Sequence, residues 1–135
     1  MALINWNPTY SVGIKEIDNQ HMKLVELVNE LHDGMKAGKG KETLGNILNE
    51  LTKYTAFHFG YEEQLFDKYT YPETTMHKRQ HQDLVAQVID YKTNFESGKA
   101  VLSMDIMNFL RDWLANHIAG SDKKYTAFLN GKGVV

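Results

Sequence analysis

The chain has 135 residues, of which 42% are hydrophobic and 24% are charged, and its formal net charge is -2 at pH 7. This length suits one globular domain with its own core, and the composition excludes a disordered, collagen-like or membrane-spanning chain. The small net charge argues against a nucleic-acid partner, and the absence of cysteine excludes disulfides and sulfur-ligated metal sites. Any metal must therefore be held by nitrogen and oxygen. Residues 1–10 lack a secretory signal pattern, so we expect a cytoplasmic protein without membrane insertion.

Four segments of the chain carry helical patterns. Turn signals at 38–40, 69–72 and 97–99 separate these segments, and a stretch without helical pattern precedes them. In each segment, hydrophobic residues recur at spacings of three and four, the period of one helical face. The four stripes are Leu24, Val25, Val28, Leu31 and Met35; Leu44, Ile47, Leu48 and Leu51; Leu84, Val85, Val88 and Phe95; and Met107, Leu110, Leu114 and Ile118.

These patterns predict an all-α fold. Four amphipathic helices joined by short turns favour an antiparallel up-down-up-down four-helix bundle, because each helix must bury its stripe against its neighbours. We expect a single domain over residues 1–135. Its parts are a non-helical arm over about 1–17, the bundle over about 18–120, and a tail over about 121–135 that contains a short C-terminal helix.

Histidines and one glutamate interrupt the hydrophobic stripes. At about 100° per residue, a spacing of four places His58 and Glu62 on one helical face, whereas Glu63 is rotated by about 140° from His58. Glu63 is therefore expected to be solvated or to lie behind a ligand. The residues expected to point inward are His21, His58, Glu62, His77, His81 and His117.

The bundle topology brings these inward residues to one end of the molecule. The start of the first helix, the end of the second, the start of the third and the end of the fourth share that end. A lone histidine on such a stripe is more often a core residue, but five with a carboxylate and no cation would leave buried donors and charge unpaired. The pattern therefore predicts a metal site. His32 lies roughly 16 Å further along the axis than His21 and is expected to be an ordinary polar residue near the far end.

A second carboxylate ligand is harder to choose. Asp122 follows His117 by five residues, which on a regular helix turns it about 140° away. The intervening Gly120 and Ser121 offer a break or bulge that would turn it back inward. Spacing alone leaves Asp122 undecided, but its place at the common end favours it over Asp112, which is expected on the outer face.

The order and spacing of these residues resemble the hemerythrin family. The matching motifs are a histidine at 21, HxxxE at 58–62, HxxxH at 77–81 and HxxxxD at 117–122, preceded by a tryptophan at 6, VGI at 12–14 and DNQH at 18–21. The resemblance covers essentially the whole chain and points to the single-domain bacterial type.

The resemblance implies a cofactor of two non-haem iron ions bridged by carboxylates and by an oxo or hydroxo group. The resemblance implies that one iron is held by His77, His81 and His117 and the other by His21 and His58. Glu62 and Asp122 are implied to bridge the two irons. Five imidazoles, two bridging carboxylates and one bridging oxygen leave one position of two octahedra open, on the iron with two histidines.

The function implied by the resemblance is reversible dioxygen binding, end-on as a hydroperoxide at the open position, in a carrier, store or delivery protein. Such a protein is not an enzyme, although minor oxidase or peroxidase activity is compatible with the site. Five neutral donors with two carboxylates favour the ferrous pair, whereas carboxylate-rich di-iron sites better support high oxidation states. The expected partners are dioxygen and an electron donor or oxygen-consuming protein.

An apolar pocket beside the open position is expected to admit dioxygen. The matching family positions are Leu24, Phe59, Trp113, Leu114, Ile118 and Tyr125. Leu114, three residues before His117, is the preferred gate, although such residues at helical spacing are also typical of plain core. Two other functions stay open. One is a di-iron oxidase, peroxidase or nitric oxide scavenger, and the other is an oxygen or redox sensor that acts through a separate partner.

Overall fold

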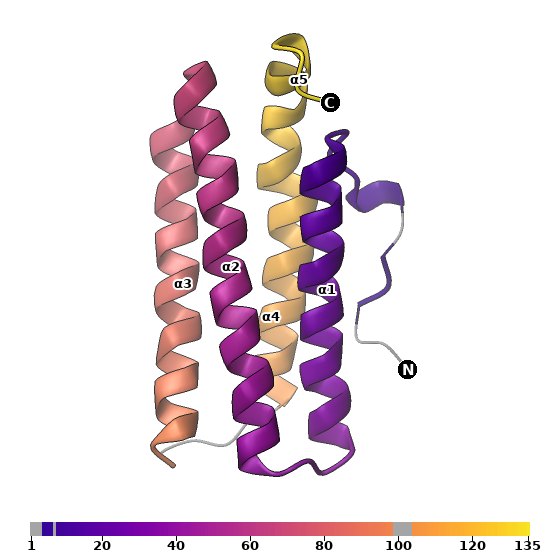
Figure 1. The fold of residues 1–135 in the computed structure, drawn as a ribbon, viewed down its shortest axis with the longest axis vertical. Helices are drawn as coiled ribbons and strands as arrows, with labels where there is room; N and C mark the ends of the chain where they lie inside the picture. The colour runs from indigo at the N-terminus through magenta and orange to yellow at the C-terminus, as the bar shows by residue number, and fades with distance from the viewer. Residues whose placement is uncertain (1–3, 7, 99–103) are drawn as a thin grey trace.

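The computed structural model describes residues 4–6, 8–98 and 104–135, and these residues form helices and no strands. Figure 1 shows the long helices packed side by side, with a short helix continuing the last of them. This arrangement confirms the predicted all-α bundle. The elements are η1, a 3-10 turn (Pro8–Tyr10), α1 (Lys15–Lys36), α2 (Lys41–Tyr69), α3 (Thr74–Glu96), α4 (Met104–Asn116), η2, a π-helical turn (His117–Asp122), and α5 (Lys123–Gly131).

The helices begin and end close to the predicted turn signals. The loops at 37–40 and 70–73 coincide with two of these signals, and α3 ends where the third begins, although residue 99 lies outside the described part of the chain. α1 begins at Lys15, slightly before the expected end of the arm, and α5 covers the expected short C-terminal helix. Within the described ranges, no helix is both long and apolar enough to cross a membrane.

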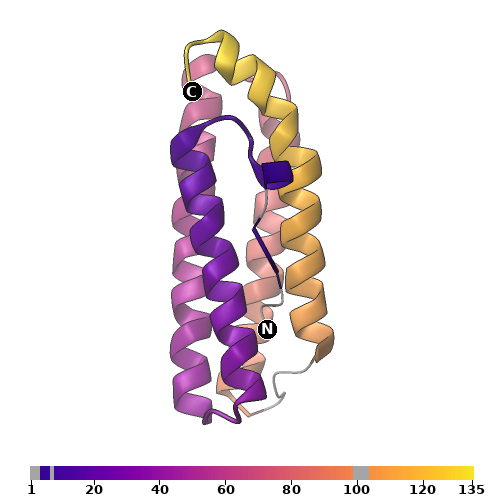
Figure 2. The same cartoon turned by 90° about the vertical axis from the view of Figure 1, so that its right-hand side faces the viewer.

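The N-terminal arm lies over α1 and α4, as Figure 2 shows. The side-chain amide of Asn29 on α1 exchanges two hydrogen bonds of 2.8 Å with the backbone of Ile4. Asp18 accepts hydrogen bonds from the hydroxyl of Ser11 at 2.6 Å and from the backbone N–H of Val12 at 2.8 Å. The hydroxyl of Thr126 on α5 donates to the carbonyl of Val12 at 2.6 Å. The arm is thus fastened to both the first and the last helix.

The predicted hydrophobic stripes form the core. All their members are buried except Met35, Ile47 and Val85, which are half-buried. Each fully buried aliphatic side chain contributes about 1.5–3 kcal/mol relative to an exposed one. The stripes therefore pack against one another along the bundle. This packing fixes the positions of the four helices relative to one another, including at the end that carries the histidines.

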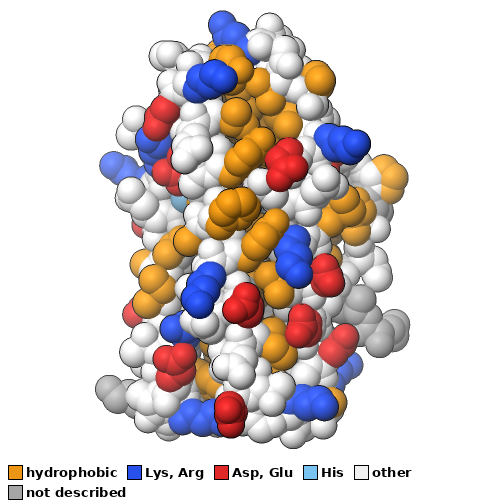
Figure 3. All heavy atoms as spheres, viewed as in Figure 1, with side chains coloured by type: hydrophobic (Ala, Val, Ile, Leu, Met, Phe, Trp, Pro, Cys, Tyr) orange, Lys and Arg blue, Asp and Glu red, His pale blue; other side chains and the backbone are white. Residues whose placement is uncertain are grey.

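The outer surface mixes hydrophobic and charged side chains. Figure 3 shows a band of hydrophobic side chains along the face that is also seen in Figure 1, with side chains of both charge signs beside it. Met22 on α1 and Phe57 on α2 are among the exposed large hydrophobic residues. Because charges of both signs are interspersed, this face does not build the concentrated field that attracts a polyanion.

The C-terminus of α2 suggests a stabilising substitution. Thr70 caps this helix in the left-handed conformation, with φ 55° and ψ 53°, and a β-branched residue is strained there whereas glycine is not. We expect Thr70→Gly to raise the free energy of unfolding by about 1 kcal/mol. Urea unfolding of metal-free samples measures the effect.

Gly38 provides the reciprocal control for this substitution. Gly38 has φ 71°, and a Cβ placed there would meet no atom within 4 Å. Gly38→Ala should therefore lose about 1 kcal/mol for conformational reasons alone. A Thr70→Gly variant no more stable than the parent would show that the left-handed threonine is not strained.

Candidate metal centre

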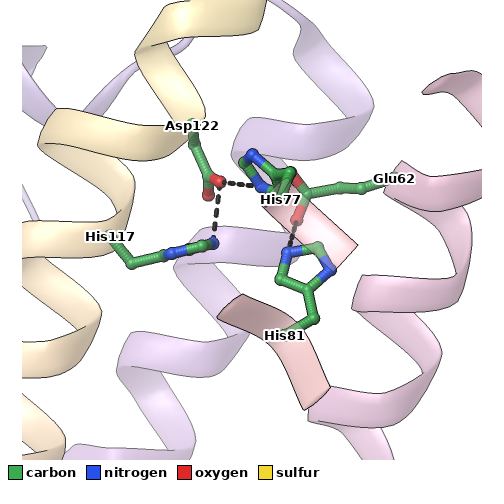
Figure 4. Close-up of side chains that lie close together, drawn as sticks. All are labelled: Glu62, His77, His81, His117 and Asp122. Atoms are coloured by element: carbon green, nitrogen blue, oxygen red, sulfur yellow. Dashed lines mark ion pairs between the residues drawn. The ribbon is translucent and has the colours of Figure 1, made fainter. Parts of the chain in front are cut away.

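Seven side chains from α1, α2, α3 and η2 converge at one end of the bundle. Figure 4 shows five of them pointing toward one another. Each is at most 6% exposed, although all are polar. The set comprises His21, His58, Glu62, His77, His81, His117 and Asp122, so the structure brings together every ligand expected from the sequence.

The donor atoms of these side chains need a cation. The five histidine Nε2 atoms and the four carboxylate oxygens are buried and, among the described residues, have no hydrogen-bond partner. Leaving a buried polar atom unsatisfied costs about 1–3 kcal/mol. Nitrogen and oxygen atoms nevertheless lie close together, for example 2.8 Å between His58 Nε2 and Glu62 Oε1. Such a separation is close to that of neighbouring donors around one ion at about 2.1 Å, so the residues fit a metal centre.

The donors form two groups that share both carboxylates. One group contains Glu62, His77, His81, His117 and Asp122, and the other contains His21, His58, Glu62 and Asp122, with donor atoms of each group within 4.8 Å of one another. Asp122 spans them directly. Its Oδ1 lies 2.9 Å from His117 Nε2 and 3.0 Å from His77 Nε2, while its Oδ2 lies 2.9 Å from His21 Nε2. The arrangement is suited to two metal ions held by shared carboxylates.

A π-helical turn places Asp122 in this centre. The turn runs from His117 to Asp122, so its i to i+5 hydrogen-bond pattern aligns two residues that a regular α-helix would direct about 140° apart. This is the bulge that the glycine and serine between them were expected to allow. Asp112 instead lies on the surface, where its Oδ1 contacts the Nε of Arg111 at 2.9 Å.

Comparison with known proteins agrees with this geometry. The family model for the hemerythrin HHE cation binding domain matches residues 12–129. The chain belongs to the hemerythrin family. A bacteriohemerythrin of Methylococcus capsulatus is 36% identical over 126 residues, which cover 93% of this chain and 95% of the relative. One from Stenotrophomonas maltophilia is 34% identical over 93% of this chain and 80% of the relative.

Solved hemerythrin structures have the same fold. A wild-type hemerythrin crystal structure matches with a TM-score of 0.87 at 34% identity, covering 93% of this chain and 97% of that chain. A hemerythrin mutant matches with a TM-score of 0.88 at the same identity, over 94% of this chain and 97% of that chain. The resemblance found in the sequence motifs is thus confirmed at the level of the family and the fold.

The electrostatics of the hemerythrin-family centre favour metal binding. Burial opposes ionisation of Asp122, but the neighbouring imidazoles, His117 foremost, outweigh it and hold its pKa well below the usual range. Burial and the charge of Asp122 also oppose ionisation of Glu62. The neighbouring imidazoles, His58 foremost, outweigh them and lower its pKa. Burial lowers the pKa of His81 to about 3. Charged carboxylates and a neutral His81 are the protonation states that a metal requires. Burial lowers the pKa of His117, but Asp122 outweighs it and raises that pKa, so a metal would displace a proton there.

Two residues behind the candidate ligands hold their imidazoles in place. His58 Nδ1 lies 2.7 Å from Gln20 Oε1, and Gln20 Nε2 in turn donates to Glu16 at 3.1 Å. His81 Nδ1 lies 2.9 Å from Glu63 Oε2. Because an amide or carboxylate oxygen can only accept, Nδ1 carries the proton in both contacts and each Nε2 is left unprotonated to face the centre. Glu63 thus lies behind a ligand, one of its two expected places, while Gln20 was missed.

A small apolar cavity of about 20 Å³ lies next to the ligand layer. Its lining residues are offset from the candidate ligands by three, four or seven positions, which on antiparallel helices means one and two turns toward the far end. The hydroxyl of Thr55 donates to its own helix, at 2.7 Å to the carbonyl of Leu51. The lining comprises Leu24, Val28, Leu51, Thr55, Leu84, Val88, Leu110, Trp113 and Leu114. A cavity of this size and character holds about one small molecule and stays dry.

Three of the six expected pocket residues line this cavity, namely Leu24, Trp113 and Leu114. The other three are buried elsewhere around the centre. Phe59 stacks on His81 with ring centroids 3.7 Å apart and an angle of 2°. The ring of Tyr125 packs against that of His77, with ring centroids 5.7 Å apart. Ile118, the residue after His117, is also buried. Their role as pocket residues stays a prediction.

His32 illustrates how the geometry separates ligand from core histidine. It is buried, with 3% of its surface exposed, yet it belongs to neither donor group. This agrees with the expectation that a histidine three turns along α1 cannot reach the centre.

Proposed function

We propose that this chain binds dioxygen reversibly at a non-haem di-iron centre and serves as an oxygen carrier, store or delivery protein. The observation that carries the proposal is the pair of donor groups that share both carboxylates, directly beside a small apolar cavity. The proposed ligands are, for one iron, His77, His81 and His117, for the other, His21 and His58, and as bridges, Glu62 and Asp122. The two irons, when bound, would supply one electron each and the bridging hydroxide would supply one proton, which together would allow dioxygen to be held end-on as a hydroperoxide at the open position.

The unequal donor groups support an open position on one side. One group offers three imidazoles and the other offers two, with the same two carboxylates in each. His21 and His58, of the smaller group, each lie three residues from a cavity residue, Leu24 and Thr55 respectively. His81 and His117, of the larger group, have the same offset from Leu84 and Leu114. A small apolar molecule in the cavity would therefore be adjacent to both proposed metal positions, the open one included.

Apolar side chains of this chain would shield bound dioxygen from water. Leu24 and Leu114 keep the neighbouring cavity apolar, so water that would assist the loss of reduced oxygen is disfavoured there. The volume of about 20 Å³ admits a diatomic molecule and excludes an organic substrate, which favours binding over an oxidase function. We expect the protein to act in the cytoplasm with an electron donor or an oxygen-consuming protein as its partner.

The visible absorption spectrum of the reduced, iron-loaded protein tests this proposal. We expect two irons per chain and a band that appears on adding air and disappears on removing it. A band that fades irreversibly while an added reductant is consumed would favour an oxidase instead. A protein that binds no iron would show that the seven residues hold something else.

Leu114→Ala tests the proposed gate. Widening the cavity next to His117 should let water reach the centre, so the oxygenated form should lose its band about tenfold faster, while iron content stays at two per chain. The decay of absorbance in air measures this rate.

Leu110→Ala is the matched control for the gate. It creates a similar cavity one turn further from the ligand layer, at a similar cost in stability of about 2–5 kcal/mol. If Leu114→Ala decays no faster than Leu110→Ala, Leu114 has no gating role of its own.

A further inference from the structure

The two donor groups differ in the charge of the residue behind one of their imidazoles. Behind His81, in the group of three histidines, the acceptor is the carboxylate of Glu63 at 2.9 Å. Behind His58, in the group of two, it is the neutral amide of Gln20 at 2.7 Å. The contacts are otherwise alike, because both use Nδ1 and both come from a residue on a neighbouring helix. The imidazole of His81 thus has a charged acceptor behind it, whereas the imidazole of His58 has a neutral one.

Glu63 is held toward His81 by its surroundings. It lies on α2, next to Glu62, and its side chain is 28% exposed. Lys78 lies on α3, one turn before His81. Its ammonium group donates to both carboxylate oxygens of Asp67, each at 2.9 Å. That lysine is therefore paired with Asp67, and the side chain of Glu63 forms its hydrogen bond with Nδ1 of His81.

A carboxylate and an amide have different effects on a metal-bound imidazole. A carboxylate that accepts the Nδ1–H makes the ring a stronger electron donor, which stabilises the more highly charged metal. A neutral amide orients the ring equally well but adds no charge. The same hydrogen-bond geometry therefore has unequal electronic consequences at the two sides.

We propose that Glu63 sets the order of oxidation within the centre, making the iron bound by His77, His81 and His117 the first to lose an electron. The neutral Gln20 leaves the other iron ferrous for longer, at the position proposed to bind dioxygen. Glu63 acts through His81 and is a positioning and tuning residue. This inference rests on the proposed di-iron function.

The test exchanges charge for amide without losing the hydrogen bond. Glu63→Gln is nearly isosteric and keeps an acceptor for His81. In a potentiometric titration with mediators, we expect two one-electron steps for the parent protein. In Glu63→Gln the first step should shift to a higher potential, and the two steps should lie closer together.

The reciprocal variant moves a charge to the other side. Because Gln20 donates to Glu16 at 3.1 Å, the exchange E16Q/Q20E keeps both the net charge and that hydrogen bond. It places a carboxylate behind His58, so the second step should shift to a lower potential. Asp112→Asn is the control, since it removes an exposed carboxylate near the centre that contacts no imidazole.

Cobalt binding provides a readout independent of oxygen. Glu63→Gln should lower the Co²⁺ affinity of one of two sites about tenfold and leave the other unchanged. The inference is overturned if Glu63→Gln binds two Co²⁺ ions with the parent's affinities and its iron centre has the parent's potentials. Glu63 would then only orient the imidazole ring of His81. If the parent protein itself does not bind two metals, the proposed function fails as well, so the two failures are distinguishable.

Discussion

Replacing Asp122 with asparagine is expected to reduce metal binding from two ions per chain to at most one. Its two oxygens face different donor groups, at 2.9 Å from His117 and 2.9 Å from His21. An amide offers only one good ligand oxygen and no charge, so it cannot serve both groups. Changing residues that merely contact a ligand costs about 10–100-fold in metal affinity, and loss of a shared ligand should cost at least as much. Iron per chain, measured by elemental analysis, gives the result.

Asp112→Asn provides the matched control. Asp112 and Asp122 are each five residues from His117, on opposite sides, and both substitutions remove one negative charge. Only Asp122 lies within the donor groups, so Asp112→Asn should retain two ions. If Asp122→Asn also retains two ions at the parent's affinity, Asp122 is not a bridging ligand.

Removing the metals is expected to lower the midpoint of thermal unfolding by about 10–20 °C. Metal that binds only the folded chain stabilises it by about 4 kcal/mol when the free ion is a thousandfold above its Kd, and a change of that size shifts the midpoint by this amount in a domain of this length. Nine buried donor atoms lose their cation when the metal leaves. Calorimetry of the iron-loaded and chelator-treated protein measures the shift, and equal midpoints would contradict a metal-dependent fold.

Acid is expected to destabilise the metal-free protein. Burial lowers the pKa of His81 from 6.5 to about 3 in the metal-free folded chain. As pH falls below 6.5, the unfolded chain takes up a proton that the folded chain refuses until about pH 3, so the free energy of unfolding falls across this window. The depressed pKa of Asp122 acts in the same direction at lower pH, whereas the pKa of His117, which Asp122 raises against the effect of burial, partly offsets the loss. Denaturant midpoints of the metal-free protein between pH 7 and 4 measure the loss, and a flat profile would contradict the buried neutral imidazole.

The centre shows where sequence reasoning succeeds and where it stops. Helical spacing placed His58 with Glu62, because both lie on one regular helix and share its geometry. Gln20 was missed for the opposite reason. Its partner is 38 residues away on another helix, and helical spacing within α1 says nothing about the neighbour that a side chain meets.

Periodicity by itself determined the all-α class, the four stripes and the end of the bundle at which the histidines gather, because these follow from backbone geometry that repeats locally. The sequence already favoured Asp122 over Asp112, and the structure shows that a π-helical turn brings Asp122 inward. Only the tertiary structure decided which charge lies behind each imidazole and how much space remains beside the centre. Those features depend on how side chains from different helices meet, and such meetings are set by packing across the bundle.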